Sequence, residues 1–514
     1  MKKTIVPFLL AGACVASMSA AAFAEEVTTE TATESAEEIT EIVLSDEAIT
    51  VNGEAVSTDE NAAVYTANDI VFYLEGQGFT YGEGTETDEH SQEEADAHTV
   101  VHITEPGTYS VSGALSAGQI AIDLGDDAEE DPNAVVNLIL DNVDISCSVA
   151  PAVIFYNVYE CGTTDEEAAG MIVDTSAAGA NVYIADDSVN NVNGSYVARI
   201  YKEYTLSEDG TEVVDNKKLH KYDAAFYSKM SMNVDGDTGI LNIQAANEGL
   251  DSELHLTLNG GNVNITSGND GINTNEDGIS VTTINGGALN IVVDGSTGEG
   301  DGIDSNGWLV INGGSVTASA CGFSGDAGID SDMGIYINGG NVAAAGNMFD
   351  HVAGGEQNYA VFTLNNRVTG GTTVTMKDAE SNVVGEWTPT NDFMYFVVSG
   401  ADLTEASYTL WNGETELGTS SSTGMMGGFG MGGRGMMGGQ MPEGMTPPEG
   451  MEFPEGGQMP EGMEIPEGGQ MPEGMTPPEG MEFPEGDQMP EGMTPPEGAE
   501  IPETEAAEEG TTSL

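Results

Sequence analysis

The sequence predicts an all-β protein: a parallel β-helix, then a small β-sandwich-like module, then a disordered low-complexity tail. Two repeated phrases carry this prediction. The tripeptide Asn-Gly-Gly recurs at spacings of 26, 27 and 26 residues, starting at Asn259, Asn285, Asn312 and Asn338. A second phrase, Gly-[Leu/Ile]-[Asp/Asn]-[Ser/Thr], starts at Gly249, Gly271, Gly302 and Gly328. A repeat of this length indicates a solenoid with two marked corners in each coil.

The first 24 residues predict a signal peptide, and therefore a secreted protein that is extracellular or associated with the cell surface. Lys2 and Lys3 form a basic end, an apolar stretch follows, and Ala22-Phe23-Ala24 gives a cleavage site. Residues 25–42 read as an acidic linker.

The β-helix is predicted over residues 43–352, with an insertion at 196–223. Apolar and polar residues alternate between the corners, which is the pattern of a strand with one buried face. Aligned on the corners, three columns of apolar residues should stack about 4.8 Å apart, the ordinary spacing of paired strands. The columns are Leu258, Ile284, Ile311 and Ile337; Val263, Leu289, Val316 and Val342; and Leu250, Ile272, Ile303 and Ile329. Glycine recurs too often for a helical solenoid.

The end of the chain predicts two further segments. Residues 355–418 contain alternating strands with turn signals at Gly370-Gly371 and Asn412-Gly413, which favour a small β module. Residues 419–514 are rich in Gly, Met, Pro and Glu, and this composition cannot bury a core, so we expect a disordered tail.

Charge excludes several functions. The chain has 87 acidic and 11 basic side chains, a formal net charge of −76. Nucleic acid and anionic lipid are therefore disfavoured partners, and no run is long and apolar enough for membrane insertion. A non-covalent association with the cell envelope stays open.

The state of Cys147 and Cys161 also stays open, because the two residues suit either a disulfide or two free thiols.

The Gly-[Leu/Ile] corners predict a calcium site, because stacked coils would turn their acids and amides into ladders of oxygen ligands. No Lys or Arg occurs between Ser231 and Asn366 to neutralise them. The alternative is a ladder that faces solvent, partly protonated or screened by salt, with Asn side chains hydrogen-bonded up the stack. The candidate ligands are Glu248, Asp251, Asp270, Asn273, Asp301, Asp304, Asp326 and Asp330.

The insertion is the candidate substrate-binding segment, since six of the few basic residues lie in it or just beyond it. Lysines can contact carboxylates, and tyrosines can stack on sugar rings or simply pack under a long loop. The candidates are Tyr201, Lys202, Tyr204, Lys217, Lys218, Lys221 and Tyr222.

The corner phrases resemble a known family. N-D-G-I-N-T, D-G-I-D-S-N-G and I-N-G-G-x-V, together with I-T-E-P-G-T-Y-S-V-S-G, are similar to clostridial carbohydrate-binding proteins of the pectate-lyase-like type. The resemblance implies a right-handed parallel β-helix that holds calcium and binds cellulose or acidic pectic sugars. Many relatives carry Lys after the corner where this chain has Asp or Asn, so an acidic sugar would have to be bridged by calcium or held by the insertion.

These observations predict a secreted, non-catalytic carbohydrate-binding protein, because no familiar catalytic motif is present. One alternative is a calcium-dependent polysaccharide lyase acting on uronates, with Lys202, Lys221 or Lys229 as its base. The other is an envelope adhesin or spacer that acts through the tail.

Overall fold

The structure is a computed structural model that describes residues 39–207 and 210–421. The predicted signal peptide, most of the acidic linker and nearly all of the predicted tail lie outside these residues. The all-β prediction is confirmed, since in the described ranges the only helical elements are α1 (Gln92–Asp96) and the 3₁₀ turn η1 (Ala128–Glu130). No described helix has the length and apolar character needed to cross a membrane.

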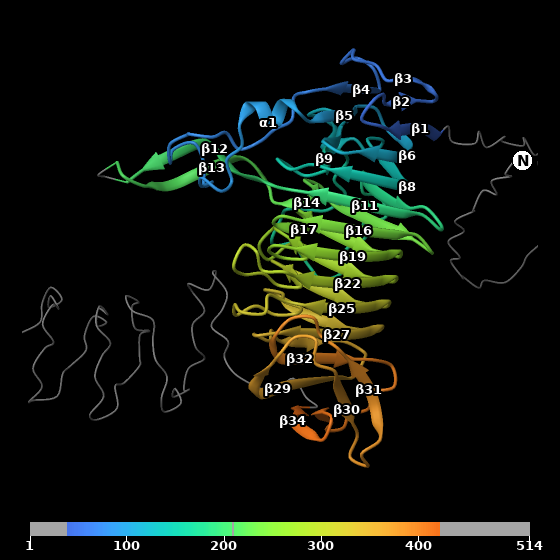
Figure 1. Ribbon diagram of the computed structural model, residues 1–514, viewed down its shortest axis with the longest axis vertical. Coiled ribbons are helices and arrows are strands. Elements are labelled where there is room, and N and C mark those ends of the chain that lie inside the picture. Colours follow the sequence, from blue (N-terminus) through green and yellow to red (C-terminus); the bar gives the residue numbers. More distant parts are fainter. Residues whose placement is uncertain (1–38, 208–209, 422–514) are drawn as a thin grey trace, which may run out of the picture. The chain divides into compact units, whose positions relative to one another are not determined.

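Most strands fall into three stacks of parallel neighbours that the chain visits in rotation (Figure 1). The first stack contains β1 (Ile39–Leu44), β6 (Gly107–Leu115), β8 (Val136–Ser146), β10 (Ala180–Ile184), β15 (Met232–Gly236), β18 (His255–Leu258), β21 (Val281–Ile284), β24 (Trp308–Ile311), β26 (Gly334–Ile337) and β28 (Val352–Gly354). The second continues from the end of β8 through β11 (Val189–Gly194), β16 (Ile240–Ala245), β19 (Asn262–Ser267), β22 (Ala288–Val293), β25 (Ser315–Ser319) and β27 (Asn341–Gly346). The third contains β5 (Thr99–Ile103), β7 (Gly118–Asp123), β9 (Val153–Asn157), β14 (Ala224–Ser228), β17 (Glu248–Ser252), β20 (Ile272–Thr274) and β23 (Ile303–Ser305), with β4 (Val64–Ala67) antiparallel at its edge.

The predicted apolar columns are confirmed by the register. Leu258 pairs with Ile284, Ile284 with Ile311, and Ile311 with Ile337. The column that starts at Val263 follows the same rule, as does the column from Leu250 to Ile303, and the members of all three columns are at most 2 % exposed. β-branched side chains and Leu fill this interior because they pack well across neighbouring strands.

The Asn-Gly-Gly tripeptides form the turns between the first two stacks, as predicted. The second glycine has positive φ, for example +76° at Gly287, which glycine adopts without strain. The first lies against the preceding turn: a Cβ on Gly286 would stand 2.5 Å from the carbonyl oxygen of Asn259. The Asn side chains donate to one another up the stack, Asn285 Nδ2 to Asn259 Oδ1 at 2.9 Å.

The segments outside the stacks are antiparallel. The predicted insertion forms a hairpin of β12 (Val197–Leu206) and β13 (Val213–Tyr222), called here the basic arm, which projects from the stacks (Figure 1). β1 begins at Ile39, inside the predicted acidic linker, and pairs antiparallel with β2 (Thr50–Val51), which pairs with β3 (Glu54–Ala55). The linker prediction therefore extends too far, because Ile39, Ile42 and Leu44 complete a strand against β6.

The C-terminal module consists of β29 (Tyr359–Val368), β30 (Val374–Lys377), β31 (Val383–Trp387), β32 (Phe393–Ser399), β33 (Thr409–Asn412) and β34 (Thr415–Ser421). β34 extends beyond the predicted end at residue 418. β32 pairs antiparallel with β27, so the module continues the second stack rather than standing apart from it. Its core includes Phe362, Phe393 and Phe396.

Candidate functional site

The Gly-[Leu/Ile] corners direct their acids to one outer surface. Leu250 is fully buried, and a Cβ on Gly249 would meet the Ile265 side chain at 2.3 Å, so two consecutive positions face the interior. The residues on either side, Glu248 and Asp251, therefore face outward together. Glycine is required here because the interior has no space for a side chain.

Stacking turns these outward residues into ladders. Asp251 pairs with Asn273, Asn273 pairs with Asp304, and the Asp330 backbone N–H continues the series by donating to Ile303. The residues before the glycine follow the same order. We call the set the corner cluster: Glu248, Asp251, Asp270, Asn273, Asp301, Asp304 and Asp330.

The first three acids of the corner cluster along the chain, called here its first rungs, are buried rather than solvent-facing. Asp251 is fully buried, Glu248 is 3 % exposed and Asp270 is 8 % exposed. Asp301, Asp304 and Asp330 are half-buried. The prediction that the ladder faces solvent is therefore wrong for the first rungs, because little of their surface is in contact with water.

Burial makes ionisation of these acids unfavourable. Burial first, and Asp223 second, raise the pKa of Glu248 to about 7 from an ordinary 4.5. Burial together with Asp332 raises the pKa of Asp304 to about 6, and burial together with Asp350 raises that of Asp330 to about 8. The pKa values of Asp251, Asp270 and Asp301 also rise through burial and their acidic neighbours.

The residues of the corner cluster fit a hard divalent cation. One ligand oxygen from each of Asp301, Asp304 and Asp330 lies within 4.8 Å of the others. On the neighbouring rungs, Glu248 Oε2 and Asn273 Oδ1 are buried without a hydrogen-bond partner, although Asn273 Nδ2 donates to Glu248 Oε1 at 3.2 Å. Buried polar atoms without a partner are uncommon, and oxygen-only donors match the preference of Ca²⁺.

Asp326 lies on the same surface, but its carboxylate already accepts a hydrogen bond from the backbone. Its Oδ2 accepts from the Gly300 N–H at 2.8 Å and from the Ser324 hydroxyl. Asp270 does the same for the Asp301 N–H at 2.6 Å, and Asp301 Oδ1 accepts from the Ala327 N–H. These carboxylates therefore hold the rungs in register, and each has less free capacity for a cation than Glu248 or Asp304.

The basic arm brings one positively charged side chain, Lys221, to the corner cluster, and the repeat pattern of the sequence does not predict this contact. Lys221 forms an ion pair with Asp223, which is 6 % exposed, and Asp223 adjoins the first rung through the hydrogen bond from the Glu248 N–H to its carbonyl. Burial alone would lower the pKa of Lys221, but Asp223, Glu248 and Asp251 outweigh it and raise that pKa. Asp223 was missed because it lies outside the corner phrase, at the end of the insertion.

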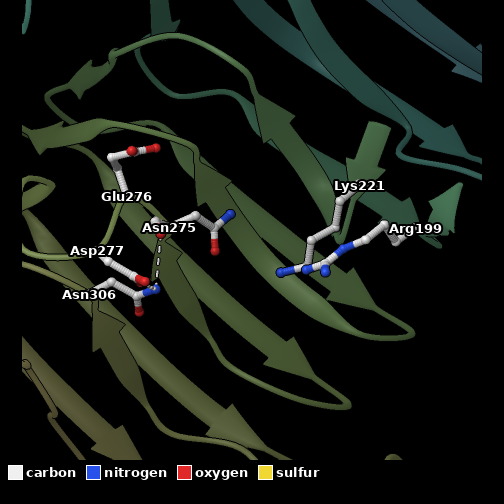
Figure 2. A pocket seen from close by; sticks show the side chains of 6 residues that line it. All are labelled: Arg199, Lys221, Asn275, Glu276, Asp277 and Asn306. Atoms are coloured by element: carbon white, nitrogen blue, oxygen red, sulfur yellow. Dashed lines mark hydrogen bonds between the residues drawn. The ribbon is translucent and has the colours of Figure 1, made fainter. Parts of the chain in front are cut away.

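A hollow of about 270 Å³ lies beside the corner cluster (Figure 2). In Figure 2 the heads of Arg199 and Lys221 lie close together on one side, and the acid and amide side chains stand on the other. The second group consists of Asn275, Glu276, Asp277 and Asn306. Asn275 links the hollow to the ladder, since its Nδ2 donates to both carboxylate oxygens of Asp251 at 3.0 Å. The hollow therefore combines cations, acids and amides next to a candidate metal site.

Of the predicted substrate-binding residues of the basic arm, Lys221 lines the hollow, and the other six separate into three groups. Tyr222 is wrong as a sugar-stacking residue, because it is 8 % exposed and its ring packs 5.3 Å from Tyr156 and from Tyr227. Lys202 and Tyr204 are exposed and Tyr201 is half-buried, so these three stay accessible. The side chains of Lys217 and Lys218 lie outside the described part of the chain.

The three cysteines within the described ranges are free. Cys147 and Cys321 are buried, and Cys161 is half-buried. Burial raises the pKa of Cys147 to about 11, so it is an unreactive core thiol.

Among the comparisons with known proteins, the match to a family model points to carbohydrate. Residues 97–384, more than half of the chain, match the family described as "Carbohydrate-binding domain-containing protein". No curated protein matches the chain. A solved structure titled as the polysaccharide lyase-like protein from C. thermocellum, a gadolinium derivative, is similar at 19 % identity and a TM-score of 0.32, covering 59 % of this chain and 94 % of that one.

Proposed function

The chain belongs to the family of carbohydrate-binding domain-containing proteins, and from this premise we propose that it binds polysaccharide without cleaving it, supported by calcium at the corner cluster. The observation that carries the proposal is a row of buried carboxylates in which Glu248 and Asn273 have side-chain oxygens without a hydrogen-bond partner. This row lies beside a hollow that is lined by the positively charged side chains of Arg199 and Lys221. Polysaccharide as the partner follows from the family. Calcium and the acidic class of the glycan are our inference from the site.

Calcium would be held by oxygens of Glu248, Asn273, Asp301, Asp304 and Asp330. It would neutralise the repulsion between neighbouring rungs and offer positive charge to a ligand. Lys221 compensates only the first rungs, because its ion-pair partner is Asp223. The acids that follow Asn273 have no such partner of their own among the described residues, and this is where the three-carboxylate cluster lies.

Of the acidic and cellulosic glycans that the family resemblance implied, the hollow suits an acidic one. Arg199 donates to Glu83 at 2.9 Å through Nη1, and its Nε is buried without a partner. A uronate carboxylate in the hollow would meet Arg199 and Lys221 on one side, and calcium at the adjoining corner cluster would offset the negative charge of the acids on the other. Cations in this arrangement make charge-assisted hydrogen bonds, which are stronger than neutral ones.

The protonation state of Lys221 supports a binding role without catalysis. Lys221 would have to be neutral to act as the base of a lyase, whereas the neighbouring acids keep it protonated and paired. Lys202 is exposed on the arm, and Lys229 lies against Asn157 with 3.4 Å between Nζ and Oδ1. Neither lines the hollow.

The test measures polygalacturonate binding and turnover together. We expect calcium-dependent binding that EDTA abolishes, and no rise in the ultraviolet absorbance of unsaturated products. Arg199→Gln and Lys221→Gln should each weaken binding about tenfold, the worth of one charge-assisted hydrogen bond. Lys377→Gln is the matched control, because Lys377 lies over the Trp411 ring in the C-terminal module. Binding that persists in EDTA, or sustained turnover, would contradict the proposal.

Two finer features belong to the same proposal. We propose that the three stacks form the walls of a right-handed parallel β-helix, which the parallel register between successive rungs supports. We also propose that the protein acts outside the cell, where calcium is abundant, as the basic and apolar residues at the start of the sequence predict.

A further inference from the structure

A second polar surface lies on the second stack, on strands other than those of the corner cluster. The strands β11, β16, β19 and β22 lie one above another (Figure 1), and their register aligns one Asn of each strand in a column. A hollow of about 400 Å³ lies over part of this column. We call this surface the amide face: Asn191, Asn242, Asn264 and Asn290, with Asn193, Gln244 and Thr266 in the column beside it.

The amides of the column are held in one orientation. Asn242 Nδ2 donates to Asn191 Oδ1, Asn264 Nδ2 to Asn242 Oδ1, and Asn290 Nδ2 to Asn264 Oδ1, each at 3.0 Å. An amide carries two N–H donors and two acceptor lone pairs. The ladder uses one of each at the middle rungs, which leaves one donor and one acceptor for a ligand. Because the ladder fixes the side chains, little conformational entropy is lost on binding.

The free groups repeat at the spacing of the strands, about 4.8 Å. A sugar unit in an extended β-1,4-linked chain has a comparable length, so a chain laid across the strands would meet a similar donor and acceptor pair at each rung. Sugar hydroxyl groups both donate and accept, which is the pairing that an amide offers. The column is half-buried from Asn191 to Asn264 and exposed at Asn290, so a ligand can reach it.

The charge of the amide face selects against an acidic glycan. The residues that line its hollow include no Lys or Arg, and one of them is an acid, Asp144. A polyanion would therefore meet only neutral or negative groups on a chain of net charge −76. An uncharged glycan has no such penalty and needs no metal.

From this geometry we propose that the amide face is a second, calcium-independent binding site for an uncharged, extended polysaccharide. The inference rests on the proposed function, since it takes polysaccharide binding as given. It assigns the two classes of glycan to different stacks: the acidic class to the corner cluster and the basic arm, and the uncharged class to the amide face.

The experiment uses the full chain with microcrystalline cellulose and with polygalacturonate as probes, each in calcium and in EDTA. We expect cellulose binding to survive EDTA. The double variant Asn242→Ala/Asn264→Ala should weaken cellulose binding about tenfold, because two hydrogen-bonding groups are lost. Gln244→Ala should weaken it severalfold; Gln244 is exposed and outside the ladder, so this variant keeps the fold. Polygalacturonate binding in calcium should not change in either.

Asn285→Ala is the matched control, because it removes an exposed ladder amide at the turns instead of on the amide face. Cellulose binding that is lost in EDTA, or that is unchanged in both amide-face variants, would overturn the proposal. Binding to polygalacturonate but never to cellulose would overturn it and leave the proposed function standing. Binding to neither probe would overturn both.

Discussion

Asp304→Asn tests whether the corner cluster is a cation site, because the change should act in opposite directions with and without calcium. In EDTA at pH 8 the Asp304 carboxylate of the wild-type protein is ionised, although burial and neighbouring acids make its negative charge unfavourable. Its pKa of about 6, against an ordinary 3.8, corresponds to about 3 kcal/mol of unfavourable ionisation. Asp304 is only half-buried, so we discount this figure to about 1–2 kcal/mol. The neutral amide removes that cost, and the variant should be the more stable protein.

Calcium should reverse the order. A ligand that binds only the folded state stabilises it by about 2.7 kcal/mol at a concentration a hundred times its Kd. The variant loses one carboxylate of the three-acid cluster and should lose most of this gain. A domain of this size shifts its unfolding midpoint by only about 1 °C per kcal/mol. We therefore expect the variant to melt about 1–2 °C above wild type in EDTA and below it in calcium.

Differential scanning calorimetry of both proteins at pH 8, in EDTA and in calcium, makes the measurement. Asp237→Asn is the control for the change of charge, because Asp237 is exposed and lies outside the corner cluster. Equal midpoints for wild type and variant in both buffers would refute the reasoning. A variant less stable than wild type in EDTA would show instead that Asp304 is stabilising as an ion without metal.

Three further predictions follow from the same structure. The metal-free protein should lose stability as pH rises from about 4 to about 8, because folding raises the pKa values of Glu248 and Asp330 to about 7 and about 8 and so favours their protonated forms. Calcium should flatten this pH profile. A thermal midpoint in EDTA that rises over this pH range would contradict the prediction. Gly286→Ala should cost about 1–3 kcal/mol in urea unfolding, because the new Cβ would press on the Asn259 carbonyl, whereas Gly325→Ala, with nothing within 4 Å, should cost little. Tyr222→Ala should lower the free energy of unfolding by about 3 kcal/mol, because the aromatic contacts of Tyr222 are lost. Tyr204 is 48 % exposed, so Tyr204→Ala should leave the thermal midpoint unchanged and weaken only polygalacturonate binding.

The repeat made much of the fold predictable from the sequence. Strands with one buried face must stack in a register that keeps their apolar residues together, since a slip of one residue would expose the whole column. The pairs of Leu258 with Ile284 and of Val263 with Leu289 follow from this rule and were predicted correctly. The boundaries were less certain, because an edge strand such as β1 carries no repeat signal of its own.

The candidate site was predictable only in part. The outward acids of the corner cluster follow from the repeat, but their burial depends on what covers them. Lys221 and Asp223 reach the first rungs because Tyr222 packs against Tyr156 and Tyr227, a contact between segments with no common pattern. The amide face was overlooked for a related reason, since single Asn residues at β-strand positions do not reveal that their side chains bond to one another.

The sequence by itself therefore determined the all-β class, the register of the rungs, the glycine turns and the identity of the acids. These are properties of a local period repeated along the chain. Only the tertiary structure decided which carboxylates lose contact with water, which cation stands beside them and how the amide donors point. Those depend on packing between residues far apart in sequence, where desolvation and hydrogen-bond geometry are set by the assembled surface rather than by any one segment.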